Sequence, residues 1–113
     1  IMYKHLLLTL LFFSLSLSAS NNFDLLRYSY IGDAKKVKET LKLHPDINTQ
    51  NDEQMTPFLY ATYKNRFEAV KVLVENGADI NALSHSGRDA LGYAFANKNK
   101  EMVNYLLQKG VKP

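Results

Sequence analysis

The sequence TPFLYA at residues 56–61, followed by GADIN at residues 77–81, recurs in weaker form on either side of itself. The first block returns as YA at residues 93–94, and the second is preceded by DIN at residues 46–48; each match lies 33 residues away. A fixed period of this length is typical of a stack of similar units, each too small to bury its own apolar face. The repeat, rather than any single residue, therefore predicts the architecture.

Each unit carries the signals of two short helices. Thr56 before Pro57 indicates a helix N-terminus, because the hydroxyl accepts hydrogen bonds from free backbone N–H groups and proline suits the first helical position. Asp89 before Ala90 is expected to cap the inner helix of the next unit in the same way. Val70, Leu73 and Val74 follow the i, i+3, i+4 spacing of a helix that is buried on one face. Inner helices are expected at about residues 57–64 and 90–97, and outer helices at about residues 34–43, 67–76 and 100–109.

Tight turns are expected between the inner and the outer helices, at Gly32, Asn65 and Lys98. If these turns need a left-handed residue, glycine suits them best, asparagine tolerates the conformation, and lysine costs about 1 kcal/mol. Gly77 and Gly110 are expected to end two of the outer helices, as glycine commonly does.

With this period and these phrases, the chain resembles the ankyrin-repeat family from about Phe23 to its end. The resemblance implies an all-α fold, a solenoid of about three stacked repeats in which paired antiparallel helices are joined by β-hairpin-like turns. The repeats are expected at about residues 23–50, 51–83 and 84–113.

The first repeat departs from the pattern at the end of its outer helix. His44 stands where the other repeats have glycine, and Pro45 follows it. Because proline disfavours a helical conformation in the residue before it, we expect the chain to leave this helix in an extended conformation.

Other departures are expected to weaken the stack. Gly92 stands inside a helix, where glycine costs about 1 kcal/mol relative to alanine. Thr40 replaces the core residue Leu73 in the first repeat, and Gln54 replaces the turn glycine Gly87. We expect a stack of modest stability that is weakest at its first repeat.

A secretory signal peptide is predicted for residues 1–19. A short basic start at Lys4 and His5 precedes an apolar run at residues 6–17 and small residues at 18–20, with cleavage expected after Ala19. The run is shorter than the roughly 20 residues of a membrane-spanning helix, so an uncleaved anchor is the weaker alternative, and a buried structural helix is another. This prediction places residues 20–113 in the bacterial periplasm or outside the cell, free of the membrane after cleavage.

Composition narrows the classes of partner. The chain has 14 basic and 11 acidic residues, and the two signs are interspersed, so no basic stripe typical of a nucleic-acid binder is present. It has no cysteine, so the domain must hold itself by packing, and no lipid-modified cysteine follows the signal.

The sequence contains no pattern typical of an active site, so we expect neither an enzyme nor a cofactor. His44 and His85 do not fall at equivalent repeat positions, whereas a zinc site needs three or four converging ligands. Asp52 and Glu53 form an acidic pair in a turn, where solvated carboxylates are usual.

Tyrosines are concentrated on the expected inner helices. Tyr60 and Tyr93 occupy equivalent positions and are expected to fill the groove between repeats as a half-buried ladder. Tyr63 and Lys64 come later on their helix and should face the concave side, and tyrosine is a residue type that often anchors protein interfaces.

In the family, the concave side is built from the turns between repeats and from the inner helices. Carried onto this sequence, the resemblance implies a monomer that binds an unidentified protein partner. Met55 and Arg88 are equivalent positions, and both are expected to be exposed. The expected partner-binding residues are Glu53, Met55, Tyr63, Lys64, Leu83, Ser86, Arg88 and Asn97.

Several functions remain open within and beyond this class. A partner-binding module could serve as a periplasmic immunity protein or as an accessory factor for a periplasmic enzyme. A haem or small-ligand carrier, with His44 or His85 as an axial ligand, is a different class. A structural fragment of a longer solenoid is a third.

Overall fold

The computed structural model describes residues 2–113, apart from the side chains of residues 2–6 and 12; Ile1, in the predicted signal peptide, lies outside the described residues. The described residues contain no strand, and their regular secondary structure is all helical, which confirms the all-α prediction. The helices are α1 (Met2–Ile31), α2 (Ala34–Leu41), α3 (Pro57–Tyr63), α4 (Phe67–Glu75), α5 (Ala90–Ala96) and α6 (Lys100–Gln108).

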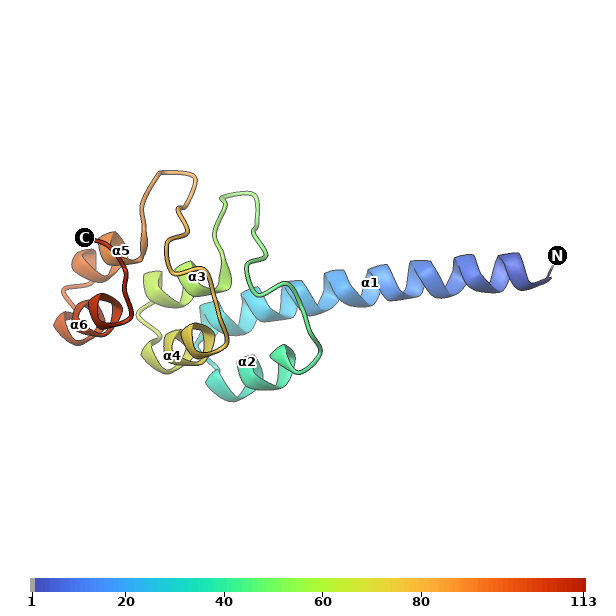
Figure 1. Ribbon diagram of the computed structural model, residues 1–113, viewed down its shortest axis with the longest axis horizontal. Helices are drawn as coiled ribbons and strands as arrows, with labels where there is room; N and C mark the ends of the chain where they lie inside the picture. Colours follow the sequence, from blue (N-terminus) through green and yellow to red (C-terminus); the bar gives the residue numbers. More distant parts are fainter. Residues whose placement is uncertain (1) are drawn as a thin grey trace.

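The helices form two layers. The end of α1 lies in one row with α3 and α5, and α2, α4 and α6 form the second row beneath them (Figure 1). α1 packs on α2 and α3, and α3 packs on α4 and α5, so each helix pair contacts the next pair along the chain. This is the stack of helix pairs that the repeat predicts.

The helix ends follow the expected capping residues. The Thr56 hydroxyl accepts a hydrogen bond from the Leu59 amide at 3.1 Å, and the Asp89 carboxylate accepts one from the Gly92 amide at 2.9 Å. Both caps confirm the predicted helix starts. The helices end one or two residues earlier than predicted, because their last residues form the turns.

The turns from inner to outer helices use left-handed residues at the three predicted positions. The φ angles are 88° at Gly32, 61° at Asn65 and 56° at Lys98. The predicted requirement for a left-handed residue is therefore confirmed, and two of the three turns meet it without glycine.

The expected extended exit at His44 is wrong. His44 has a φ of 56° and its amide donates to the Leu41 carbonyl at 3.1 Å. The equivalent Gly77 has a φ of 88° and bonds to Val74 at the same distance. The hydrogen bond and the stacking geometry of the repeat thus set this conformation, and they override the local preference that Pro45 imposes.

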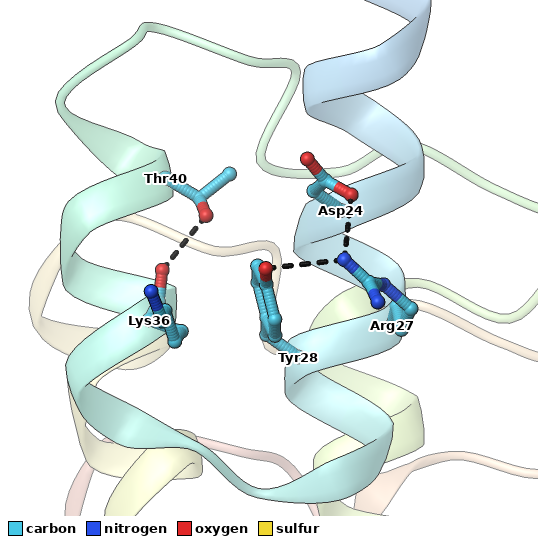
Figure 2. A network of polar contacts seen from close by, with 5 residues as sticks. All are labelled: Asp24, Arg27, Tyr28, Lys36 and Thr40. Atoms are coloured by element: carbon cyan, nitrogen blue, oxygen red, sulfur yellow. Dashed lines mark hydrogen bonds and ion pairs between the residues drawn. The ribbon is translucent and has the colours of Figure 1, made fainter.

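The core runs between the helix layers and includes residues from every repeat. Val37 and Val70 are fully buried at equivalent positions, and Leu73 is buried beside them. At the position of Leu73 the first repeat has Thr40, whose buried hydroxyl donates to the Lys36 carbonyl at 2.7 Å (Figure 2). The polar substitution is therefore satisfied within α2, although it buries less apolar surface.

The first part of α1 extends away from the stack (Figure 1). Thirty residues of helix span about 45 Å, and the longest dimension of the molecule is 61 Å. All described side chains of residues 7–20 are exposed, and Asn21 is the first that is buried. Among the described residues, no helix combines the length and the hydropathy of a membrane span. The boundary predicted between residues 19 and 20 falls inside α1 and stays a prediction.

Asn22 closes the first repeat from within α1. Its side-chain oxygen accepts a hydrogen bond from the Asp46 amide at 2.8 Å. One repeat later, the side-chain oxygen of Asn48 accepts a hydrogen bond from the Asp79 amide at the same distance. In the first case the acceptor is an asparagine in a helix, and in the second it is an asparagine in a loop.

Candidate partner-binding surface

Two hairpin-like loops rise beside the inner helices (Figure 1). In the first, the Asn51 amide donates to the Met55 carbonyl at 3.2 Å; in the second, the Ser84 amide donates to the Arg88 carbonyl at 3.0 Å. Each loop turns through a left-handed residue, Gln54 or its equivalent glycine. The two loops therefore share one backbone design, with Gln54 replacing glycine at some cost in strain.

A hydrogen bond joins the two loops, and Met55 is not exposed as expected. The His85 amide of the second loop donates to the Glu53 carbonyl of the first at 2.9 Å. Met55 is only 4% exposed, and its sulfur accepts a hydrogen bond from the Tyr93 hydroxyl at 3.5 Å. The expectation that Met55 is exposed is therefore wrong: the next repeat covers it. The equivalent residue, Arg88, is exposed as expected.

The tyrosines make one contact that repeats with the period of the chain. The ring centroids of Tyr30 and Tyr60 lie 5.3 Å apart, and those of Tyr63 and Tyr93 lie 5.3 Å apart. Tyr60 and Tyr93 are half-buried, which confirms the predicted ladder between repeats. The third repeat has Ala96 at the position of Tyr30 and Tyr63, so the ladder ends at Tyr93.

Two cations on this surface lie over aromatic rings without a carboxylate partner. The Lys64 ammonium lies 4.9 Å from the ring centroid of Tyr30 and 5.6 Å from that of Tyr63. The Arg88 guanidinium lies 5.5 Å from the ring centroid of Tyr93. Among the described residues, the recorded salt bridges use other cations: Arg27 with Asp24, Lys36 with Glu39 and Lys71 with Glu68.

The other predicted residues separate into structural and free side chains. The Asn97 amide donates to the carbonyls of Thr62 and Tyr63 at 3.1 and 3.2 Å, so it joins α5 to the end of α3. Ser86 shares a 2.9 Å hydrogen bond with Ser84 in its own loop. Glu53, Tyr63, Leu83, Ser86, Arg88 and Asn97 are exposed, whereas Lys64 is half-buried and Met55 is buried.

A small pocket lies at the first-repeat end of this surface and was not predicted. Its volume is about 280 Å³. Tyr30 and Tyr60 line it, as do Phe23 and Leu26. Phe23 and Leu26 were not predicted, because none of the expected partner-binding residues lies on α1. The pocket is lined by Phe23, Leu26, Arg27, Tyr30, Asn51 and Tyr60.

The pocket wall contains a tyrosine hydroxyl with altered acidity. Burial raises the pKa of Tyr60, and the Glu53 carboxylate raises this pKa further. A hydrogen bond between the Asn51 side-chain amide and the Tyr60 hydroxyl opposes these effects. The Tyr60 hydroxyl is therefore neutral at physiological pH. In this state its hydrogen bond with Asn51 joins the first loop to α3.

A second pocket, of about 470 Å³, belongs to the end of the stack rather than to this surface. Phe95 and Val103 line it, and both face the side where a further repeat would lie. The equivalent residues one repeat earlier, Thr62 and Val70, are fully buried by the third repeat. The pocket is thus the unstacked face of the last helix pair.

Two of the three histidines lie outside the predicted signal peptide, and one of them, His85, lines a small pocket together with Met55 and Tyr93. His44 follows α2 and His85 lies in the second loop, and both side chains are exposed. Among the side chains that the structure describes, no three or more of the types that bind metal ions lie together.

Comparison with known proteins agrees with the repeat pattern of the sequence. A family model described as ankyrin repeats (3 copies) matches residues 16–113. An ankyrin repeat protein of Rickettsia bellii is 39% identical over 61 residues, which cover 54% of this chain and 36% of that protein.

Two longer relatives match most of this chain. An ankyrin repeat and SAM domain-containing protein of Rattus norvegicus is 37% identical over 82 residues, covering 71% of this chain and 9% of its own length. A palmitoyltransferase of Lachancea kluyveri is 30% identical over 87 residues, covering 76% of this chain and 12% of its own. The chain therefore spans about a third or less of the length of these relatives.

Proposed function

The chain belongs to the ankyrin-repeat family, whose repeats generally act as protein–protein interaction modules, and on this premise we propose that it binds a protein partner through its concave surface. This concave surface comprises the two loops and the exposed sides of α1, α3 and α5. It includes six of the expected residues that stay accessible, namely Glu53, Tyr63, Leu83, Ser86, Arg88 and Asn97, and the half-buried Lys64.

The observation that carries this proposal is the exposure of large side chains on rigid supports. Tyr63 is 48% exposed, although its ring packs on Tyr93, and Leu83 is 53% exposed beside the hydrogen-bonded loops. Aromatic residues and arginine dominate the binding energy of protein interfaces, and rigid side chains lose little entropy on binding. The surface is thus preorganised for a protein partner.

Affinity capture tests the proposal. The chain is immobilised and exposed to an extract of the organism that makes it, in parallel with a Tyr63→Ala, Leu83→Ala, Arg88→Ala variant. Met55 is left intact because it is buried, and its truncation would destabilise the fold. The variant is expected to lose the partner that the unchanged chain retains.

A matched variant on the outer helices provides the control. Leu43 is exposed after α2, and Lys109 is exposed at the end of α6. Leu43→Ala, Lys109→Ala should retain the partner and have the same circular dichroism spectrum. Retention of the partner by the concave variant would refute the assigned surface.

Export is the second part of the proposal: residues 1–19 act as a signal peptide and residues 20–113 form the mature domain. The exposure of the described side chains at residues 7–20 supports this division, because the stack does not depend on them for burial. The mass of the protein purified from the periplasm or the medium tests it. A mature chain that begins at Ser20 is expected, and a full-length chain in the cytoplasm would refute export.

Within this class, an immunity protein and an enzyme-accessory factor use the same surface and differ in the partner. The identity of the captured protein separates the two roles. Haem carriage predicts instead a Soret shift on addition of haemin that disappears when His44 and His85 are both replaced.

A further inference from the structure

The small pocket between α1 and α3 has the size and lining of a site for one apolar side chain. Phe23, Leu26, Tyr30 and Tyr60 contribute ring and aliphatic surface to it, and Phe23 is 65% exposed. Its volume of about 280 Å³ lies at the lower end of the roughly 300–1,000 Å³ that is usual for ligand sites. Because the pocket adjoins the surface that we assign to a protein partner, we take its occupant to be an apolar side chain of that partner.

A cation stands directly beside this pocket. Tyr30 lines the pocket, and the Lys64 ammonium lies 4.9 Å from the centroid of the Tyr30 ring. Among the described residues, no carboxylate forms a salt bridge with Lys64, and the hydroxyls of Tyr30 and Tyr63 make no recorded hydrogen bond. The Lys64 ammonium thus lies close to two exposed tyrosines, whose hydroxyls are free of hydrogen bonds to the described residues.

The other cation at the pocket is already occupied. The Arg27 guanidinium donates to the Asp24 carboxylate and to the Tyr28 hydroxyl, each at 3.1 Å (Figure 2). Lys64 is therefore the cation that remains available to a ligand. Its side chain is half-buried against the Tyr30 and Tyr63 rings, and these contacts hold the ammonium in place for a carboxylate of a ligand.

We propose that a partner docks through a short segment that places a large apolar side chain in this pocket and a carboxylate on Lys64. This inference rests on the proposed binding through the concave surface and specifies the chemistry of the partner. Asp52 and Glu53 at the tip of the first loop limit the carboxylates to one or two, because a longer acidic run would meet like charge there. The same two residues disfavour a nucleic-acid backbone on this surface.

Nuclear magnetic resonance of the full ¹⁵N-labelled chain tests the site with defined probes. The dipeptide N-acetyl-Phe-Glu-amide is titrated in parallel with N-acetyl-Phe-Gln-amide, N-acetyl-Phe-Lys-amide and N-acetyl-Gly-Glu-amide. The Phe-Glu probe is expected to shift the amide signals of the pocket residues and of Lys64. We expect the Phe-Gln probe to bind about twofold to fivefold more weakly, as for an accessible ion pair, and the other two probes to bind more weakly still.

Two variants test the carboxylate contact and the apolar pocket separately. Lys64→Met should remove the difference between the Phe-Glu and Phe-Gln probes, whereas Phe23→Ser should weaken both. Lys109→Met is the matched control, because the Lys109 ammonium lies 5.6 Å from the Tyr105 ring centroid on the outer helix α6. If Lys64→Met perturbs the fold, as its spectrum would show, Lys64→Gln replaces it.

The outcomes separate this inference from the broader proposal. Equal binding of the Phe-Glu and Phe-Gln probes, or signals that shift only outside the pocket, would overturn the inference. If that happens while the Tyr63, Leu83 and Arg88 variant still loses the captured partner, binding through the concave surface stands and only the segment chemistry is wrong. Probe binding that Lys64→Met weakens and Lys109→Met does not supports the inference directly.

Discussion

Within residues 2–113, four residues other than glycine adopt left-handed backbone conformations, and all four lie in turns of the repeat. They are His44, Gln54, Asn65 and Lys98, with φ between 56° and 61°. Outside asparagine, this conformation brings the Cβ atom close to the following carbonyl oxygen and costs about 1 kcal/mol or more. The stack therefore stores strain at defined single positions.

Replacement of Lys98 by glycine should relieve this strain. Lys98→Gly is expected to stabilise the chain by about 0.5–1 kcal/mol, less than the full strain because glycine gains entropy in the unfolded state. The midpoint of thermal unfolding, followed by circular dichroism, should rise by a few degrees.

The control is the same substitution inside a helix. Lys38 is exposed in α2, and Lys38→Gly should destabilise the chain by about 1 kcal/mol. Loss of stability in both variants would contradict the assigned strain at Lys98.

Tyr105 carries a buried hydroxyl without a hydrogen-bond partner among the described residues. Its ring packs on Phe67 with centroids 5.3 Å apart, so the aromatic contact survives removal of the hydroxyl. Tyr105→Phe is expected to stabilise the chain by about 1 kcal/mol, since an unsatisfied buried hydroxyl is costly. Chemical denaturation measures the change, and Tyr93→Phe, which removes a hydroxyl that bonds to Met55, should give no gain.

Stability should fall in strongly alkaline solution, because the hydroxyls of Tyr105 and Tyr60 are withdrawn from solvent in the folded chain. Burial raises the pKa of Tyr105, with the Glu75 carboxylate adding to the effect, and burial and Glu53 raise that of Tyr60. The unfolded chain releases these protons near pH 10, before the folded chain does. As pH rises from about 10 through the higher folded pKa values, the unfolded state therefore gains in stability. Unfolding midpoints measured from pH 8 upward should decline in this window, and Tyr105→Phe should lessen the decline.

Single residues also show what the sequence could and could not predict. Asn65 and Lys98 were assigned correctly because a repeat aligns them with Gly32, and Thr56 and Asp89 because capping is local. Met55 was misjudged because its burial depends on Tyr93 and on the second loop, contacts that no local pattern contains. His44 was misjudged because a local rule about proline was weighed above the geometry of the repeat.

At the scale of elements, α1 is the helix that differs most from its expected form. The sequence predicted an inner helix in the first repeat but not its continuation with the preceding apolar run as one helix of 30 residues. The apolar run is itself compatible with helix, and no glycine or proline interrupts residues 2–31. The stack begins to bury this helix at Asn21.

The bond from Asn22 gives α1 a testable role as the edge of the stack. Asn22→Ala removes the acceptor of the Asp46 amide, and a loss of about 1 kcal/mol in the free energy of unfolding is expected. Asn48→Ala removes the equivalent bond one repeat later and should lose a similar amount. Ser20→Ala, at an exposed position of the same helix that the proposed cleavage leaves in the mature chain, should change nothing. An unchanged stability for Asn22→Ala would show that α1 does not close the first repeat.

At the scale of the whole molecule, the repeat divides the residues into those that hold the stack and those that it leaves free. The residues of the 56–61 block are buried or half-buried, so they maintain packing between repeats. Lys64, Leu83 and Arg88 are not required by that packing, and they lie on the surface that we assign to a partner. The sequence identified most of this surface from the family pattern, but it missed the pocket, which forms only where α1, α3 and the first loop meet.

Photocrosslinking in the organism that makes the protein tests the concave surface most directly. A photoreactive phenylalanine analogue replaces Tyr63 in one strain and the exposed Leu43, at the end of α2, in another. Irradiation should produce a discrete adduct with one protein from position 63 and none from position 43. Adducts from position 43 alone, or none from position 63 at normal expression, would contradict binding through the concave surface.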